Sequence, residues 1–213
     1  MGATREYESH LENILRLSSK HLSHIRPSNL LDVGCGDGTR TLLLAQYFRV
    51  PPSCTFGVEF YEPHVRKAEE SFHASQIDLE ADCLPYGDGK FDLVICNQVL
   101  EHLKNYQGVF DQIIRTTKSG GYIILGIPNL AHLMNRFQLT LGIQPMCIDL
   151  YSSHVRGFTH KAFEKILRST SGISYIACEG SNLIYPLPLF LARPLSRLYV
   201  GICAYTCYLA KKL

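Results

Sequence analysis

The sequence lacks an excess of charge of either sign. Its 213 residues carry a formal net charge of +2, only 19% of them are charged, and no block of Lys and Arg stands out. Because proteins that bind nucleic acids carry a clustered basic footprint, we expect no nucleic-acid partner. The apolar fraction of 46% predicts a globular chain, with residues 1–213 forming a single domain around a sizeable core.

The eight cysteines lack the C-x-x-C spacing of a zinc or redox motif. Cys203 and Cys207 are four residues apart, but no His or second Cys pair stands near them, so we expect no metal site. The first 20 residues carry charges throughout and lack an apolar run, so we expect neither a secretion signal nor a membrane span there. Scattered cysteines without such a signal indicate reduced, mostly buried thiols and a cytoplasmic protein.

The most informative pattern is an apolar segment, residues 29–33, that runs into the glycine-rich turn Gly34-Cys35-Gly36-Asp37-Gly38. Glycines let the main chain approach a ligand closely, and the helix that follows directs its first N–H groups at that ligand. A dinucleotide fingerprint needs a small residue where Thr39 stands, and the Asp32 carboxylate would repel a pyrophosphate. The pattern therefore favours S-adenosylmethionine, which has a sulfonium and an ammonium group but no phosphate, over a nicotinamide dinucleotide.

The segment from Asp32 to Gly38 resembles motif I of the class I S-adenosylmethionine-dependent methyltransferases. The resemblance implies an α/β fold with a Rossmann-like, doubly wound seven-stranded sheet, mostly parallel with one antiparallel strand and helices on both faces. The alternation of strand and helix signals agrees with a mostly parallel sheet. The strands are expected at residues 29–33, 55–59, 77–81, 91–97, 121–127, 173–179 and 203–210.

The resemblance assigns residues at the ends of these strands to the cofactor. Glu59 ends the second strand at the spacing where an acid meets ribose hydroxyls, and Asp82 would accept the adenine amine. Asn97 ends the fourth strand, where the methyl donor and the acceptor meet in this fold. The implied cofactor residues are Asp32, Gly34, Cys35, Gly36, Glu59, Phe60, Asp82, Cys83, Leu84, Asn97, Gln98 and Val99, with S-adenosylhomocysteine as the product.

A narrower likeness concerns the acceptor. Residues 127–136 and 154–159 are similar to segments of MetW-like and ubiquinone-type methyltransferases, which implies a small-molecule or lipid-like acceptor. Residues 129–158 read as an insertion after the fifth strand that forms a lid and a substrate pocket, with a surface helix and a loop as the alternative. The expected substrate contacts are His132, Arg136, His154 and Arg156.

Methyl transfer from a sulfonium is an in-line displacement that needs alignment and exclusion of water more than covalent chemistry. A base is needed if the methyl acceptor is a hydroxyl or an acidic carbon. His102 and His154 are the candidate catalytic residues, and His132 is a third candidate. No Asn-Pro-Pro-Tyr motif follows the fourth strand. Because this motif is absent, the alternative interpretation is a non-catalytic methyltransferase-like domain that binds S-adenosylmethionine, S-adenosylhomocysteine or a protein partner.

Two flanking segments remain. Residues 1–27 show helical spacing of apolar residues and are expected to form a helical cap over the cofactor, or a helix that packs on the sheet. Residues 183–200 are apolar, but their prolines and arginines argue against a transmembrane helix, and we expect a crossover before the last strand. Residues 184–200 also fit a peripheral membrane contact or a dimer face, so a monomer and a homodimer both remain open.

Overall fold

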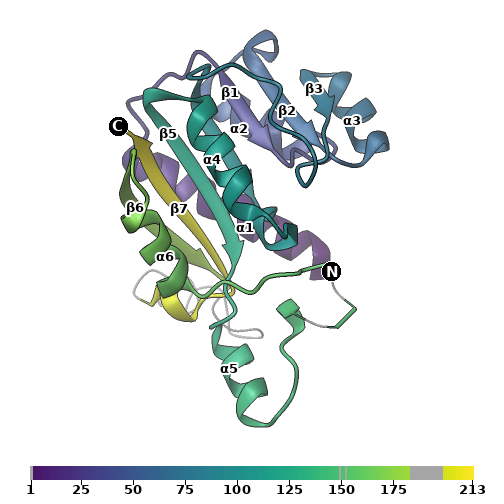
Figure 1. The fold of residues 1–213 in the computed structure, drawn as a ribbon, viewed down its shortest axis with the longest axis vertical. Coiled ribbons are helices and arrows are strands. Elements are labelled where there is room, and N and C mark those ends of the chain that lie inside the picture. Colours follow the sequence, from purple (N-terminus) through teal and green to yellow (C-terminus); the bar gives the residue numbers. More distant parts are fainter. Residues whose placement is uncertain (1, 149, 152, 183–198) are drawn as a thin grey trace.

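The computed structural model describes residues 2–148, 150, 151, 153–182 and 199–213. Seven strands form one sheet in the order β3-β2-β1-β4-β5-β7-β6 (Figure 1). Their bounds are β1 Leu30–Val33, β2 Thr55–Glu59, β3 His73–Gln76, β4 Phe91–Asn97, β5 Thr117–Pro128, β6 Ile173–Ser181 and β7 Tyr205–Lys212. The first five strands pair in parallel, whereas β7 lies antiparallel to both of its neighbours. The expected doubly wound sheet with one antiparallel strand is thereby confirmed.

Helices cover both faces of this sheet (Figure 1). The α-helices are α1 Gly2–His21, α2 Thr39–Phe48, α3 Glu62–Glu69, α4 Tyr106–Thr116, α5 Leu133–Thr140 and α6 His160–Ser169. The short 3-10 helices are η1 Pro52–Cys54, η2 Leu100–His102, η3 Met146–Ile148 and η4 Val200–Ile202. Within the described ranges, no helix is both long enough and apolar enough to cross a membrane.

The strand β4 shows how the two layers are assembled. Successive side chains of a strand point to opposite faces. Leu93 and Ile95 accordingly join a core with α1 and α2, whereas Val94 and Cys96 join a second core with α4 and α6. Since both faces are covered, β4 reads as a nearly continuous apolar run in the sequence, as the strands of parallel sheets do.

The third strand was expected at residues 77–81, and this expectation is wrong. β3 spans His73–Gln76, and the residues after it form a turn in which the N–H groups of Ala81 and Asp82 donate to the carbonyl of Asp78. An edge strand with one side exposed needs no apolar run, so the polar sequence of β3 gave little signal. Ile77 and Leu79 misled the assignment because they pack against the core from the turn instead.

The helix α1 packs on the sheet at β6 and β7 (Figure 1). Asn13 donates to the Ser181 hydroxyl at 2.8 Å, Arg16 donates to the Gly180 carbonyl at 2.7 Å, and Lys20 pairs with the buried carboxylate of Glu179. This is the packing role stated above as the alternative for residues 1–27. The covering of the cofactor by this segment stays a prediction.

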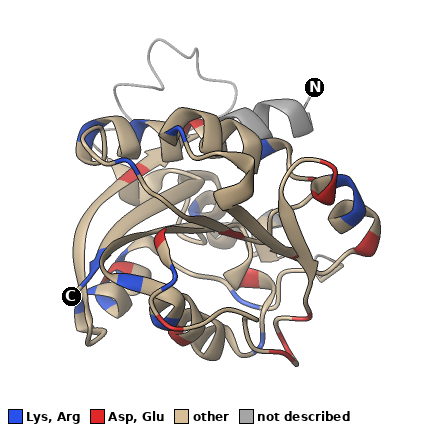
Figure 2. Ribbon diagram, turned by 90° about the horizontal axis from the view of Figure 1, so that it is seen from above, with Lys and Arg blue, Asp and Glu red and all other residues tan. Residues whose placement is uncertain are grey.

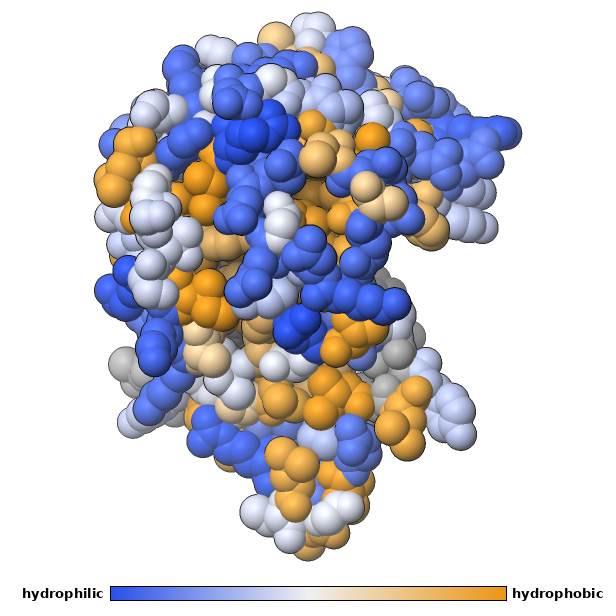
Figure 3. Space-filling model, in the orientation of Figure 1, coloured by the Kyte–Doolittle hydropathy of each residue, from blue (hydrophilic) through white to orange (hydrophobic). Residues whose placement is uncertain are grey.

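Among the described residues, the projecting α5 and the chain after it carry most of the exposed large apolar side chains. Figure 3 shows apolar surface over this projection, whereas Lys and Arg are interspersed with Asp and Glu over the described ribbon (Figure 2). The exposed apolar residues there are Leu133, Met134, Phe137, Leu139, Leu141, Ile143, Leu150, Tyr151 and Val155. The lid role of residues 129–158 stays a prediction. The expected crossover and membrane contact of residues 183–200 fall almost wholly outside the described residues.

Asp32 is a buried acid in the middle of the sheet. It lies on β1 between Gly57 of β2 and Ile95 of β4, only 6% exposed, and accepts a 2.6 Å hydrogen bond from the Thr41 hydroxyl. Burial raises the pKa of Asp32 from 3.8 to about 6, although the hydrogen bond from Thr41 opposes this rise. The ionised carboxylate at neutral pH therefore costs stability.

Replacing Leu17 by Ala tests the packing of α1. Leu17 is fully buried, so its truncation should lower the free energy of unfolding by about 2–5 kcal/mol. Urea unfolding followed by circular dichroism measures this, with Leu43→Ala as the control. Leu43 is 44% exposed, so its loss should change the free energy by less than about 0.5 kcal/mol. Equal effects of the two variants would contradict the placing of α1.

The variant Asp32→Asn keeps an acceptor for Thr41 but removes the charge. Folding raises the pKa of Asp32, so the folded state favours the protonated acid. The contribution of Asp32 to the free energy of unfolding is therefore fully present below pH 3.8 and is lost as the pH rises through about 6. The stability of Asp32→Asn relative to the wild type should therefore increase by about 1 kcal/mol between pH 5 and pH 8. Urea unfolding at the two pH values measures this change.

Asp37→Asn is the matched control for the pH series. Its carboxylate accepts a hydrogen bond from the Thr39 N–H, and this bond lowers the pKa of Asp37 from 3.8. Its contribution to stability is lost only at lower pH, so the effect of Asp37→Asn should be the same at pH 5 and pH 8. A pH-independent effect of Asp32→Asn as well would show that Asp32 is not the buried acid described.

Candidate cofactor and acceptor site

Most of the residues expected to hold the cofactor lie at the carboxyl ends of β1, β2 and β4, whereas Asp82, Cys83 and Leu84 lie in the loop before β4. The strand order runs outward from β1 through β2 to β3 and from β4 to β5, so the direction of winding reverses between β1 and β4. Ligands of open α/β sheets bind at such a reversal, beyond the carboxyl ends of the strands. In Figure 3 the outline of the molecule is notched between the end that carries β3 and α3 and the projecting α5.

The glycine-rich turn after β1 is held in place from two sides. The N–H groups of Gly34 and Cys35 donate to the Val58 carbonyl of β2 at 2.8 and 3.1 Å. Gly34 has a φ of +80°, and a side chain there would collide with the Cγ2 methyl of Val99. Gly36, with a φ of +57°, has no described atom within 4 Å of the place where a Cβ would be. The turn is therefore packed against Val99 at Gly34, whereas at Gly36 there is space for a ligand to approach the main chain.

Glu59 links the end of β2 to this turn. Its Oε2 accepts a 2.9 Å hydrogen bond from the Gly36 N–H, and its Oε1 accepts from the N–H groups of Phe60 and Tyr61 at 3.0 and 3.1 Å. Each carboxylate oxygen can accept more than one hydrogen bond. The carboxylate is therefore fixed in orientation and retains capacity for the two hydroxyls of a ribose, as expected for Glu59.

The loop that carries Asp82 lies at the surface. Asp82 and Cys83 are exposed, whereas Leu84 is buried in the core. The neighbouring Glu80 accepts hydrogen bonds from the N–H groups of Lys104 and Asn105, which fastens the loop to the start of α4. The structure thus leaves the Asp82 carboxylate accessible, and its contact with adenine stays a prediction.

The end of β4 is strained and polar. Gln98 has a φ of +59°, a conformation that residues other than glycine adopt rarely, and its N–H donates to the Gly126 carbonyl at 2.9 Å. A side chain at Gly126 would collide with the Asn97 amide, so glycine lets Asn97 lie against β5. The buried Asn97 Nδ2 has no hydrogen-bond partner among the described residues. Such strain and unsatisfied polar atoms are typical of functional sites.

The two candidate catalytic histidines lie together, although they are about 50 residues apart. His102 is on η2, His154 lies after η3, and their ring centroids are 4.7 Å apart. The Val155 and Arg156 N–H groups donate to the main-chain carbonyl of Glu101 at 3.0 and 3.1 Å, which holds the two segments together. Burial lowers the pKa of His102, so its imidazole is neutral near pH 7 and able to accept a proton.

Glu101 and Thr41 also belong to this region, although the sequence patterns did not mark them as site residues. Glu101 is fully buried, and burial raises its pKa to about 8. The nearby main-chain N–H of Glu101 opposes this rise in pKa, although it does not meet the geometry of a hydrogen bond with the carboxylate. A charged residue is rarely buried, so nothing in the local pattern marked Glu101 beyond its place before His102. Thr41 could have been found from its spacing, since the first turn of α2 lies over the end of β1.

The four expected substrate residues do not form one group in the structure. Arg156 donates to the Lys104 carbonyl at 2.8 Å and lies over the Tyr106 ring, on the same side as His154. Arg136 instead donates to the carbonyls of Ala131 and Gly201, and His132 is the N-cap residue of α5. The two pairs therefore belong to different ends of the insertion.

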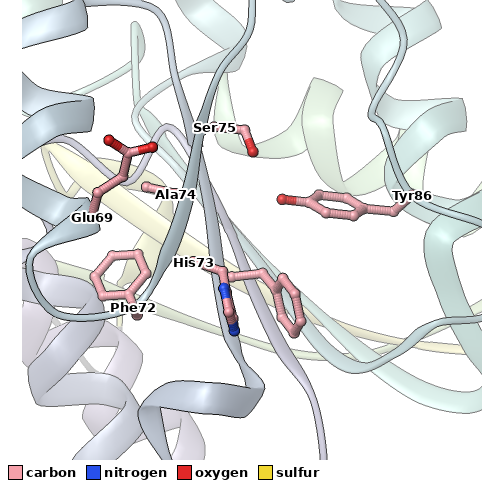
Figure 4. Close-up of a pocket in the computed structure, with 7 residues that line it drawn as sticks. Glu69, Phe72, His73, Ala74, Ser75 and Tyr86 are labelled. Atoms are coloured by element: carbon pink, nitrogen blue, oxygen red, sulfur yellow. The ribbon is translucent and has the colours of Figure 1, made fainter.

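A separate pocket of about 400 Å³ lies at the β3 edge of the sheet (Figure 4). The Tyr86 and Ser75 hydroxyls point toward one another across it (Figure 4). Its lining residues are Phe56, Glu69, Phe72, His73, Ala74, Ser75 and Tyr86. None of them belongs to the expected cofactor or substrate set, so this pocket is distinct from the site at the carboxyl ends of the strands.

Comparison with known proteins agrees with this geometry. Residues 3–170 match the family described as methyltransferase domain. An uncharacterized methyltransferase of Schizosaccharomyces pombe is 33% identical over 119 residues, which cover 50% of this chain and 42% of that protein. The ajmaline N-methyltransferase of Rauvolfia serpentina is 28% identical over 139 residues, which cover 58% of this chain and 47% of that enzyme. The matched part of the chain thus spans less than half the length of these relatives.

Solved structures support the same fold. A S-adenosylmethionine-dependent methyltransferase of Thermotoga maritima superposes with a TM-score of 0.67 at 17% identity, covering 97% of this chain and 89% of that one. The family match extends over most of the chain, from α1 to the end of α6, and includes the glycine turn, Glu59 and the end of β4. The chain therefore belongs to the methyltransferase-domain family, as a class I methyltransferase whose cofactor is S-adenosylmethionine.

Proposed function

We propose that this protein transfers a methyl group from S-adenosylmethionine to a small-molecule or lipid-like acceptor by in-line displacement. The observation that carries the proposal is the arrangement around the end of β4. The glycine turn contacts Val99 on one side, and His102, the last residue of η2, lies on the other with the His154 ring against it. A donor bound at the turn and an acceptor beside the histidines would thus meet at Asn97.

The geometry supplies what such a displacement needs. The sulfonium is an activated leaving group, so the protein must mainly align the reacting atoms and exclude water. Asp32, on the β1 side of the turn, is a carboxylate that favours a nearby cation. His102 or His154 accepts the acceptor's proton, and the lowered pKa of His102 keeps that imidazole in the neutral form required of a base.

The class of acceptor rests on the relatives and on the exposed apolar surface. The ajmaline N-methyltransferase, which is named for its methyl acceptor, shares the matched segment with this chain. The projecting α5, which follows β5, carries exposed apolar side chains such as Phe137 and Leu139. An apolar acceptor would remove these side chains from water. A small apolar or lipid-like molecule is therefore the acceptor class we propose.

Calorimetric titration with S-adenosylhomocysteine, with NAD as the control ligand, tests the donor half of the proposal. We expect binding of the first and none of the second. Asp32→Ala, Glu59→Ala and Asp82→Ala should each weaken binding by about 1–3 kcal/mol, because each loses a hydrogen bond with a charged group. Glu62→Ala removes an exposed acid of the neighbouring α3 and should leave the affinity unchanged. Unchanged binding in all three site variants would refute the cofactor assignment.

Transfer of a labelled methyl group to a panel of small hydroxy compounds and lipids tests the acceptor half. With an acceptor in hand, His102→Asn or His154→Asn should lower kcat by about 10²–10⁴-fold if that histidine is the base, and should leave S-adenosylhomocysteine affinity unchanged. An equal loss in His64→Ala, an exposed histidine of α3, would contradict the assignment. Binding of S-adenosylhomocysteine without turnover of any acceptor would favour the non-catalytic binding domain.

A further inference from the structure

We propose that Glu101, His102 and His154 form a binding site for one divalent transition-metal ion beside the end of β4. One carboxylate oxygen and one nitrogen from each ring lie within 4.8 Å of one another. Ligand atoms around an ion with bonds of about 2.0–2.2 Å are separated by about 3–3.5 Å. Binding therefore draws the three side chains together by about 1 Å, which small rotations of these side chains can supply.

The Glu101 carboxylate is the first reason to infer a ligand here. It is fully buried, and neither of its oxygens accepts a hydrogen bond from any described residue. A buried carboxylate without partners is costly, and buried charges in proteins are normally paired or coordinate a metal. The two atoms that share its surroundings and could coordinate with it are the nitrogens of His102 and His154.

The orientation of the two histidines is the second reason. Nδ1 of His102 lies 3.2 Å from the Ser153 carbonyl, and Nδ1 of His154 lies 2.6 Å from the Cys147 carbonyl. In both rings the main-chain oxygen fixes Nδ1 as the protonated nitrogen, so Nε2 carries the lone pair. Histidines that bind metals almost always donate their other ring N–H in this way. These two contacts are independent of the Glu101 carboxylate.

The ligand set indicates the class of ion. Two imidazoles and one carboxylate suit zinc, cobalt, manganese or ferrous iron, whereas Mg²⁺ and Ca²⁺ prefer oxygen ligands alone. Three protein ligands also leave coordination positions open. In the proposed methyltransferase these positions would take an oxygen atom of the acceptor. An ion bound there would occupy Nε2 of both histidines, so the ion, in place of a histidine base, would make the proton of that oxygen easier to remove. The metal site itself does not depend on that reaction.

The proposed site differs from the expectation, drawn from the sequence, that the protein has no metal site. That expectation rested on the cysteines, which lack the spacing of known metal motifs. Glu101 and His102 are adjacent in the chain, and His154 follows about 50 residues later, so no short motif joins them. Hydrogen bonds from Val155 and Arg156 to the Glu101 carbonyl bring the third residue into place.

Metal titration of the untagged, chelator-treated protein tests the proposal without any methyl acceptor. Zn²⁺ binding is measured against a chromophoric chelator, and Co²⁺ is added separately to record its visible absorption. We expect one ion per chain and a rise in Tm with Zn²⁺, and a much smaller rise with Mg²⁺. Loss of a metal-bound residue should weaken Zn²⁺ binding by about 100-fold or more, since even residues that only orient the ligands contribute 10–100-fold.

Glu101→Gln, His102→Asn and His154→Asn are the site variants, each measured singly. His64→Ala and His73→Ala are the controls, since they remove exposed histidines from α3 and β3. Titration with S-adenosylhomocysteine verifies that each variant is folded, and a variant that fails this check is judged by the other two. Loss of the ion in the site variants alone supports the proposal. Absence of stoichiometric binding, or equal binding by the site variants and the controls, overturns it whether or not the cofactor binds.

Discussion

The site depends on the contact between the glycine turn after β1 and the chain that follows β4. Gly34 lies against the Val99 side chain, and the N–H of Gly36 is held by the Glu59 carboxylate. These two contacts join three parallel strands at one edge, where the direction of winding reverses. Any larger residue at Gly34 would collide with the Val99 side chain and separate the turn from the chain after β4, where the proposed donor and acceptor would meet.

Unfavourable groups are concentrated at this same edge. Asp32 is buried and accepts a hydrogen bond from the Thr41 hydroxyl, the buried Glu101 carboxylate accepts none from the described residues, and Gln98 adopts a positive φ. Each of these features costs stability in a protein with no ligand bound. They persist because the apolar layers on both faces of the sheet, built by α1 and α2 on one side and α4 and α6 on the other, stabilise the strands from which they project. The cost of the site is thus offset by a core that takes no part in the chemistry.

The acceptor side is organised differently from the cofactor side. Gly34, Glu59 and Asn97 belong to regular strands or to the turns directly after them. The residues of the acceptor side instead come from η2 and from the long insertion, joined by main-chain hydrogen bonds to Glu101 and by the histidine contacts with Cys147 and Ser153. In the proposed reaction, the edge formed by regular strands would hold the donor, and the less regular segment would surround the acceptor.

The sequence alone determined the sheet, the glycine turn and the cofactor, because buried strands and positive-φ glycines leave local patterns of apolar runs and small residues. It misplaced β3, whose polar edge sequence carries little signal, and it left open whether residues 1–27 cap the cofactor or pack on the sheet, where α1 contacts β6 and β7. Only the tertiary structure decided that Glu101 is buried and that His154 reaches His102, whereas Arg136 does not join them. The physical reason is distance along the chain: hydrogen bonds and burial that join segments about 50 residues apart leave no local periodicity from which they could be predicted.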